Sequence, residues 1–123
     1  MTTEAGREGP RGVVLVVDDD PDVRATVVNM LEPHGFTVID AAGGRQALEV
    51  LERDPTIDVL FTDVMMPGIS GITLAKKALA MRPGLRVVLT SAYFRDDTEQ
   101  FACLRKPFRS NELVRAIAGE VRV

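Results

Sequence analysis

The sequence predicts an α/β fold in which helices cover both faces of one parallel, five-stranded sheet. Three observations support this prediction. The run Val13–Val17 is apolar without interruption, as expected for a strand that is buried on both faces. Short runs of this kind alternate with stretches of helical period along the whole chain. Turn-forming pairs, such as Pro67-Gly68 and Pro83-Gly84, separate the segments.

The first half of the chain is predicted to continue with a helix, a strand and a second helix. The first helix starts at about Asp22 and stops at Gly35, because glycine tolerates the conformation that ends a helix. Since Pro33 disfavours the α conformation in the residue before it, the last turn of this helix should be irregular. A short strand is predicted at Phe36–Ala41, and Arg45–Arg53 is predicted to form an amphipathic helix.

The second half of the chain is predicted to add three strands, alternating with helices. The strands are predicted at Val59–Phe61, Arg86–Thr90 and Cys103–Arg105. Between the first two lies a helix whose apolar residues recur at helical spacing, namely Ile72, Leu74, Ala75, Ala78 and Leu79. The segment Asp96–Ala102 is long enough for two helical turns at most. Ser110 is the expected N-cap of the last helix.

Five strand–helix units are too few for a closed eight-stranded barrel, so the sheet is expected to be open. The natural arrangement is the doubly wound, flavodoxin-like strand order 2-1-3-4-5, with a shortened fourth helix. In this order, the first and third strands flank the switch point of the sheet. Ligands bind there, beyond the carboxyl ends of the strands.

Length and composition are typical of one small globular domain. For a chain of 123 residues, we expect a folded domain over residues 11–123 and a short disordered lead-in at residues 1–10. The longest apolar runs are far shorter than the ~20 residues of a membrane helix. The net charge of −3 and the absence of tryptophan argue against a nucleic-acid surface. The single cysteine, Cys103, cannot form a disulfide within the chain, so we expect a cytoplasmic protein.

Polar and charged side chains follow four of the predicted strands. Asp18 and Asp19 follow the first strand, and Asp63 follows the third. Thr90 ends the fourth strand, and Lys106 follows the fifth. Because the carboxyl ends of parallel strands share one edge of the sheet, we expect these side chains to lie close together.

Carboxylates that lie this close together repel each other. Two of them about 4 Å apart repel by ~4 kcal/mol at an effective dielectric of about 20, so the cluster requires a proton, a cationic side chain or a hard metal ion. A few oxygen ligands, without a cluster of His and Cys, favour Mg²⁺ over Ca²⁺ or Zn²⁺. Lys106 can neutralise a carboxylate, and Thr90 can donate to a phosphoryl oxygen. Phosphoryl transfer to an aspartate needs these groups.

Each of these residues also has a simpler explanation when it is taken alone. The run Asp18–Asp20 could be a solvated turn, with a helix cap at Asp20. Asp63 could be an ordinary loop carboxylate, and Thr90 an ordinary strand residue. Lys106 could belong to a surface turn. The joint position of these residues at the ends of four strands is what favours a single site.

Four segments of the sequence carry a more specific signal. In chain order they read VVLVVDDDPDVR, FTDVMMPGISG, VVLTSAY and LRKPF. Together they resemble the four motif blocks of the receiver domains of two-component response regulators. The resemblance extends from about Arg11 to Val121, and the four blocks in order are much more specific than any one of them.

The resemblance implies a role for each acidic residue. Asp63 would be the phosphoacceptor. Asp19 and Asp63 would bind Mg²⁺ directly, together with the main-chain carbonyl of Met65. Asp18 would act on the metal mainly through a water molecule.

The resemblance also implies how the site is operated. Thr90 would be the switch hydroxyl drawn toward the phosphoryl group, Lys106 would pair with that group, and the Lys106–Pro107 bond would be cis. The donor would be a phosphohistidine on a sensor histidine kinase or a phosphotransfer protein, docking near the first helix and the rim loops. Such a domain is no enzyme beyond its own phosphorylation and dephosphorylation. We expect a monomer or weak dimer that signals through a protein partner, without nucleic acid or membrane.

The sequence departs from the family pattern in two places. Fifteen residues separate Thr90 from Lys106, which shortens the fourth-helix region as in receivers of hybrid sensor kinases and some stand-alone receivers. Three residues before the lysine, where the family usually has Tyr or Phe, this sequence has Cys103. Tyr93 and Phe101 could replace the aromatic residue, but neither lies at the matching position. Cys103 is expected to be a small buried apolar residue.

Turnover of the phosphorylated state is expected to be slow. Hydrolysis of an acyl phosphate needs an in-line water, and the residues two positions after Asp63 and Thr90 should flank its path. These are Met65 and Ala92, whose apolar side chains cannot orient water.

Three functions from other classes compete with this interpretation. A phosphatase or mutase of the haloacid-dehalogenase group would carry a second carboxylate two residues after its aspartyl nucleophile, where this sequence has Met65. A flavodoxin-like cofactor binder would have Gly, Ser or Thr in the first strand-to-helix turn, which here reads Asp-Asp-Asp-Pro-Asp. A degenerate receiver, serving only protein–protein interaction, would lack part of the residue set that is present.

Overall fold

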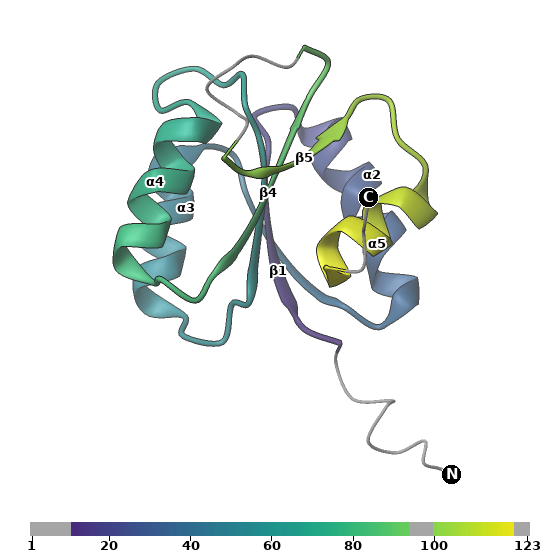
Figure 1. Cartoon of the computed structure of the whole chain (residues 1–123), viewed down its shortest axis with the longest axis horizontal. Coiled ribbons are helices and arrows are strands. Elements are labelled where there is room, and N and C mark those ends of the chain that lie inside the picture. Colours follow the sequence, from purple (N-terminus) through teal and green to yellow (C-terminus); the bar gives the residue numbers. More distant parts are fainter. Residues whose placement is uncertain (1–10, 94–99, 120–123) are drawn as a thin grey trace, which may run out of the picture.

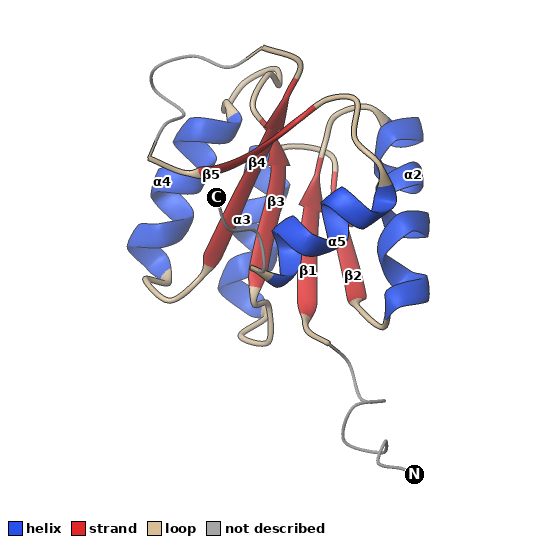
Figure 2. Ribbon diagram, turned by 45° about the vertical axis from the view of Figure 1, so that its right-hand side comes forward, coloured by secondary structure: helices blue, strands red, loops and turns tan. Residues whose placement is uncertain are grey.

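The computed structural model describes residues 11–93 and 100–119, which contain one parallel sheet of five strands. The strands are β1 (Val13–Val17), β2 (Thr37–Ala41), β3 (Val59–Asp63), β4 (Arg86–Ser91) and β5 (Ala102–Arg105). Their order is β2-β1-β3-β4-β5, which confirms the arrangement predicted from the sequence. Because all neighbouring strands are parallel, their carboxyl ends share one edge, which lies at the top of the sheet in Figure 2.

Helices lie on both faces of the sheet (Figure 1). On one face are α3 (Gly44–Arg53) and α4 (Gly71–Met81), and on the other are α2 (Pro21–Leu31) and α5 (Ser110–Ala118). This three-layer arrangement covers both faces of the central strands.

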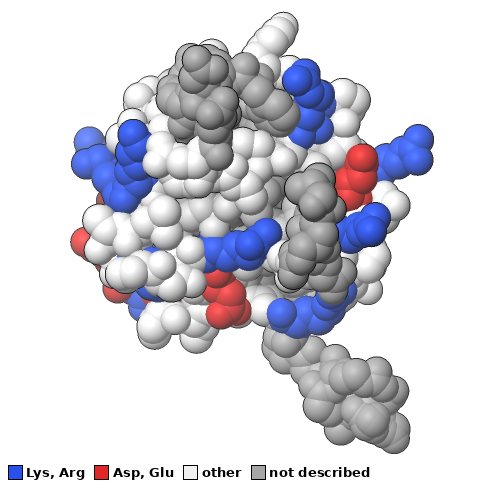
Figure 3. Space-filling view, viewed as in Figure 1, with Lys and Arg blue, Asp and Glu red and all other residues white. Residues whose placement is uncertain are grey.

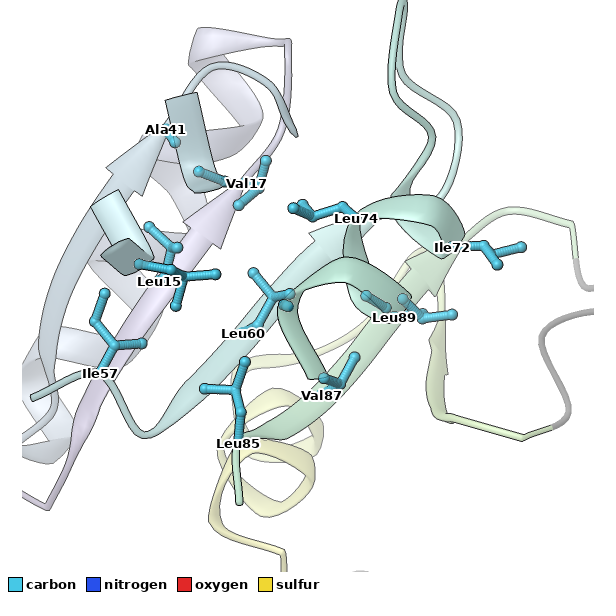
Figure 4. Close-up of a cluster of buried hydrophobic side chains, with 14 of the residues drawn as sticks. Leu15, Val17, Ala41, Ile57, Leu60, Ile72, Leu74, Leu85, Val87 and Leu89 are labelled. Carbon is cyan, nitrogen blue, oxygen red and sulfur yellow. The ribbon is translucent and has the colours of Figure 1, made fainter. Parts of the chain in front are cut away.

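The core consists of two apolar layers, one on each face of the sheet. Successive side chains of a strand point to opposite faces, so Leu15 and Val17 of β1 pack toward α3 and α4. Val14 and Val16 pack toward α2 and α5. Figure 4 shows the first layer, in which Leu60 of β3 is the register partner of Leu15. Each fully buried side chain of this size contributes about 1.5–3 kcal/mol, so the two layers fix β1 and β3 firmly.

The strand boundaries differ slightly from those predicted. β3 extends beyond the predicted Val59–Phe61, so Asp63 is the last residue of the strand rather than a loop residue. β4 reaches Ser91, and β2 begins at Thr37, one residue later than predicted. β5 begins at Ala102, which was predicted to belong to a helical segment. Because Asp63 pairs with Thr90 of β4 in the longer β3, the sheet fixes the main-chain position of Asp63.

Two predictions concern helix ends. The 3₁₀ turn η1 (Glu32–His34) follows α2 and ends at Gly35, whose φ of 93° confirms the role of this glycine and the irregular last turn. The predicted N-cap Ser110 was wrong, because Ser110 is already helical and Arg109 is the N-cap. The Arg109 N–H donates to Glu112 Oε1 (2.7 Å), so a residue three positions further on supplies the cap.

Some expectations lie outside the described residues. They concern the lead-in at residues 1–10 and the shortened fourth helix, of which residues 94–99 are not described. Among the helices that the structure describes, none combines the length and the apolar character needed to cross a membrane. On the face shown in Figure 3, the described Lys and Arg side chains (blue) are scattered, and some of them lie beside Asp and Glu side chains (red).

Helix α4 starts directly against the end of β3. The Gly71 N–H donates to the Val64 carbonyl oxygen (2.9 Å). A Cβ atom at Gly71 would overlap the carbonyl oxygen of Asp63 and would lie 2.8 Å from the Cα atom of Val64. Both neighbours are main-chain atoms that cannot turn aside, so a glycine is required for this close approach. Gly71 therefore helps to set the main chain of Asp63.

Gly71→Ala should lower the free energy of unfolding by about 1–3 kcal/mol, because α4 or the end of β3 must shift to admit the methyl group. Urea denaturation measures this difference. Gly84→Ala is the matched control, since a Cβ atom at Gly84 meets nothing within 4 Å, and its stability should stay within about 0.5 kcal/mol of the wild type. Equal stability of the two variants would contradict the close contact at Gly71.

Candidate functional site

The predicted site residues meet at the carboxyl edge of the sheet. Asp18 follows β1, Asp63 is the last residue of β3, and Lys106 follows β5. Thr90 lies in β4, where it is the register partner of Asp63. The central strands β1 and β3 thus supply carboxylates, and the next two strands supply a hydroxyl and an ammonium group.

Three carboxylates form a compact acidic cluster, and the ammonium group of Lys106 lies beside two of them. One carboxylate oxygen from each of Asp18, Asp19 and Asp63 lies within 4.8 Å of the other two. Lys106 Nζ lies 3.6 Å from Asp18 Oδ2 and 3.5 Å from Asp63 Oδ2. Asp18 and Asp63 are buried, whereas Asp19 is exposed. A single ammonium group beside a cluster of three carboxylates leaves an excess of negative charge.

Burial raises the pKa of Asp63 above its ordinary value of 3.8, because the charged carboxylate loses hydration at this edge. The positive charge of Lys106 acts in the opposite direction, and the negative charge of Asp18 adds to the increase. The Met65 N–H donates to Asp63 Oδ1 (3.4 Å), which favours the charged form. A cation beside Asp63 would therefore stabilise its ionised, nucleophilic form.

The loop between β1 and α2 holds the acidic residues through its own hydrogen bonds. Asp18 Oδ1 accepts from the Asp20 N–H (2.9 Å), while Asp18 Oδ2 faces Lys106. Asp20 is the N-cap of α2, as predicted, and its Oδ1 accepts from the Asp22 N–H (2.9 Å). The Asp19 side chain lies exposed at the rim between these two residues. One acidic run thus contains a buried site residue, an exposed site residue and a cap.

Thr90 contributes a buried hydroxyl to the same edge. Its Oγ1 atom has no hydrogen-bond partner among residues 11–93 and 100–119. Leaving a buried polar atom unpaired costs roughly 1–3 kcal/mol, so such atoms are uncommon. The neighbouring Ser91 hydroxyl, by contrast, donates to the Tyr93 carbonyl (2.7 Å). The Thr90 hydroxyl is therefore available to an oxygen atom of a bound ligand.

The acidic cluster fits a small, hard cation. Its side chains offer only oxygen atoms as ligands. Among the described residues, these three acidic side chains lie close enough together to hold a metal ion. A cation placed among the carboxylates would offset their mutual repulsion, which is about 4 kcal/mol for a pair 4 Å apart at a dielectric of ~20. Oxygen-only ligation excludes the sulfur and nitrogen sets that favour zinc. The cluster can therefore hold a metal ion.

The segment around β5 contains the departure from the family pattern. The Lys106–Pro107 peptide bond is cis, as the resemblance implied. Cys103 is partly rather than fully buried, and it packs against the apolar layer on the α3 and α4 face. Of the two aromatic residues that could replace the usual Tyr or Phe, Phe101 packs against this layer, whereas Tyr93 is 77% exposed. Phe101 thus shares its packing surface with Cys103.

An apolar groove of about 490 Å³ opens beside the acidic cluster. It is lined by α2, by the segment after β4 and by the segment after β5, through Asp22, Val23, Thr26, Val27, Met30, Ala92, Lys106, Pro107 and Phe108. Lys106 lines the groove and also faces Asp18 and Asp63 of the cluster, so an occupant of the groove would lie beside the acidic cluster. No local sequence pattern predicts this groove, because its lining comes from three segments that lie far apart in the chain.

A comparison with known protein families agrees with this geometry. The family model of the response regulator receiver domain matches residues 14–118 of this chain. The chain belongs to this family. A receiver domain is a signalling module whose chemistry is limited to its own phosphorylation, and it is not an enzyme acting on other substrates. Membership implies a phosphoacceptor role and a histidine kinase as partner.

The relatives of this receiver domain include separate and fused proteins. CpdR, a response regulator receiver protein from Brucella abortus, is 32% identical over 111 residues, covering 85% of this chain and 92% of CpdR. A cyclic di-GMP phosphodiesterase from Thermotoga maritima is 42% identical over 86 residues, covering 70% of this chain but 22% of the relative. The solved structure of chemotaxis protein CheY4 from Vibrio cholerae has a TM-score of 0.83 and 25% identity, covering 89% of this chain and 98% of CheY4.

Asp63→Asn should stabilise the metal-free protein at neutral pH. Because the pKa of Asp63 is raised by folding, protonation favours the folded state between the ordinary pKa of 3.8 and the raised pKa. This contribution is lost as the pH rises through the raised pKa, so ionised Asp63 lowers stability at pH 7. We expect the variant to gain on the order of 1 kcal/mol at pH 7, with a smaller gain toward pH 4, in urea denaturation with EDTA.

Asp54→Asn is the control for this measurement. Hydrogen bonds from the Thr56 side chain and main chain lower the pKa of Asp54, so its ionised form contributes stability at neutral pH. This variant should not gain stability. A destabilised Asp63→Asn variant at pH 7 would contradict the raised pKa of Asp63.

Proposed function

We propose that this receiver domain is an Mg²⁺-dependent phosphoacceptor switch of a two-component phosphorelay. It takes a phosphoryl group from a sensor histidine kinase or a phosphotransfer protein onto Asp63, and it then signals through, or relays to, a partner protein. The observation that carries the proposal is the position of Asp63. This residue lies at the end of a central strand, 3.5 Å from Lys106 and within the cluster of three carboxylates.

Mg²⁺ is the cation that we assign to the acidic cluster. Asp19, Asp63 and the main-chain carbonyl of Met65 bind it directly in this proposal, and Asp18 acts mainly through a water molecule. A site with few oxygen ligands suits Mg²⁺, which keeps several waters, better than Ca²⁺, which takes six to eight ligands. When bound, Mg²⁺ neutralises charge on the carboxylates and on the incoming phosphoryl group.

The transfer is a displacement at phosphorus. A carboxylate oxygen of Asp63 bonds to the phosphorus atom of the phosphohistidine, while the P–N bond breaks and the imidazole leaves with the electron pair. Lys106 holds the phosphoryl group as a point charge. The buried Thr90 hydroxyl, which lacks another partner among the described residues, donates to the same group. The product is an acyl phosphate on Asp63.

The phosphodonor is proposed to dock in the apolar groove beside α2. The groove offers apolar side chains such as Val23, Met30 and Phe108 to a partner helix. It shares Lys106 with the acidic cluster, so a histidine on a helix seated there would reach the rim. Burial of the apolar groove would supply affinity, and the position of the histidine would supply specificity for Asp63.

The receiver domain is proposed to span residues 11–123, with residues 1–10 as its lead-in. The family match over residues 14–118 supports the main part of this range. The chain spans 22% of the length of the phosphodiesterase from Thermotoga maritima and 12% of the sensor kinase CckA from Brucella abortus. The activities of those longer proteins are not assigned to this chain. The cytoplasmic location and the monomeric or weakly dimeric state remain predictions.

Phosphorylation should be visible in the intact mass of the protein. Incubation with acetyl phosphate and Mg²⁺ should add one phosphoryl group to the wild type, and EDTA should prevent it. Asp63→Asn should stay unmodified, because its amide is not a nucleophile. Asp54→Asn, which alters a partly exposed residue at the end of α3, should be modified like the wild type.

Other results would redirect the proposal. Modification of Asp63→Asn would place the acceptor at another residue. If neither acetyl phosphate nor a phosphorylated kinase modified the wild type, and Mg²⁺ did not bind, the domain would be a protein–protein interaction module instead.

The acyl phosphate on Asp63 should hydrolyse slowly, over minutes or longer, because neither Met65 nor Ala92 can orient a water molecule. The Met65 side chain is 61% exposed, so it can be replaced without disturbing the core. Met65→Gln, which introduces an amide, should shorten the lifetime about 3- to 10-fold in a mass-spectrometric time course. Met81→Gln is the control, because Met81 is exposed at the C-terminal end of α4. A wild-type lifetime of seconds would contradict this expectation.

A further inference from the structure

Arg24 of α2 contacts two segments. One is the loop between β1 and α2, Asp18–Asp20, called the acidic loop below, and the other is the end of β2. Its Nε atom forms an ion pair with Asp40 Oδ2 (3.1 Å), and its Nη1 atom donates to the main-chain carbonyl of Asp18 (2.8 Å). The Arg24 side chain is 19% exposed, whereas half of the Asp40 side chain is exposed. A guanidinium group is planar and has donors in fixed directions, so it can hold both partners at once.

The carbonyl of Asp18 is the group through which the acidic loop is oriented. The Asp18 N–H already donates to the Ala41 carbonyl (3.3 Å), and the Asp18 side chain accepts from the Asp20 N–H. The Asp18 carbonyl belongs to the planar peptide unit that joins Asp18 to Asp19. A donor held on this carbonyl therefore sets the direction in which the chain enters Asp19.

We propose that Arg24 is a positioning residue for the metal site and that Asp40 anchors it. Arg24 acts through the Asp18–Asp19 peptide unit, which carries two of the three clustered carboxylates. Its contacts set the affinity for Mg²⁺, in addition to any effect on the stability of the fold. This inference rests on the Mg²⁺ site of the proposed function.

Geometry and charge predict opposite effects for the loss of Arg24. A cationic side chain near the cluster repels Mg²⁺, so removal of its charge alone would tighten Mg²⁺ binding. Removal of the donor on the Asp18 carbonyl would instead let the loop rotate, and ordering it again would weaken binding. A change in fold stability alone would leave the Mg²⁺ affinity of the folded molecules unchanged. The sign of the change separates the three cases.

Mg²⁺ affinity can be measured from the amide NMR shifts of the nitrogen-15-labelled protein during titration with MgCl₂. We expect Arg24→Ala to weaken binding about 5- to 10-fold, near the low end of the effect of residues that orient metal ligands. Arg86→Ala is the matched control, because Arg86 donates Nη2 to the Ala116 carbonyl (3.0 Å) from the start of β4, at the opposite edge of the sheet. It removes the same charge and a similar contact, and should change affinity less than about twofold.

Further variants keep the test decisive. The dispersion of the spectra shows whether each variant is folded. If Arg24→Ala is unfolded, the Mg²⁺ affinity of Arg24→Lys tests the positioning role instead. Arg24→Lys keeps the positive charge but loses the planar guanidinium group with its donors in fixed directions, so it should still weaken Mg²⁺ binding. Asp40→Ala should weaken binding in the wild type and add little in the Arg24→Ala background. Additive effects would refute Asp40 as the anchor.

Two results would overturn the inference in different ways. Unchanged or tighter Mg²⁺ binding in the folded Arg24 variants would overturn the positioning role alone, because the wild type would still bind the metal. If the wild type itself showed no Mg²⁺-dependent shifts, the proposed metal site and the role of Arg24 would fail together.

Discussion

The mutual repulsion of Asp18 and Asp63 is the constraint on which the rest of the structure depends. Asp63 ends β3, Asp18 follows the adjacent strand β1, and both belong to a cluster whose carboxylate oxygens lie within 4.8 Å of one another. Lys106 faces both of them but carries one charge. The remaining cost is balanced by packing, because β1 and β3 are covered by apolar layers on both faces. The buried central strands thus hold two carboxylates that repel each other.

The same electrostatic cost makes the site sensitive to the binding of a ligand. A site whose groups were all satisfied in the free protein would gain little from binding a ligand. Here, burial raises the pKa of Asp63, and the Thr90 hydroxyl has no partner among the described residues. A cation would correct the first deficit, and a phosphoryl oxygen would correct the second. In the proposed function, binding energy therefore comes from groups that the fold keeps unsatisfied.

The acidic cluster and the departures from the family pattern lie on different elements of this receiver domain. The acidic cluster is built on the end of β3 and the loop between β1 and α2, where the sequence follows the family motifs. The departures lie around β5, where Cys103 occupies the usual aromatic position, and before it. Relatives use the domain both as nearly a whole protein, as in CpdR, and as a small part of longer chains.

The sequence by itself determined the strand order, the edge at which the site lies and the residues that meet there. It could do so because strands buried on both faces need continuous apolar runs, and parallel strands bring their carboxyl ends together. Only the tertiary structure decided the apolar groove and the contact of Arg24 with the Asp18 carbonyl. It also decided that the Thr90 hydroxyl has no partner among the residues that the structure describes. These features depend on how α2 and the strand ends are placed relative to one another. Side-chain packing across the whole domain sets that placement, and local sequence patterns do not contain it.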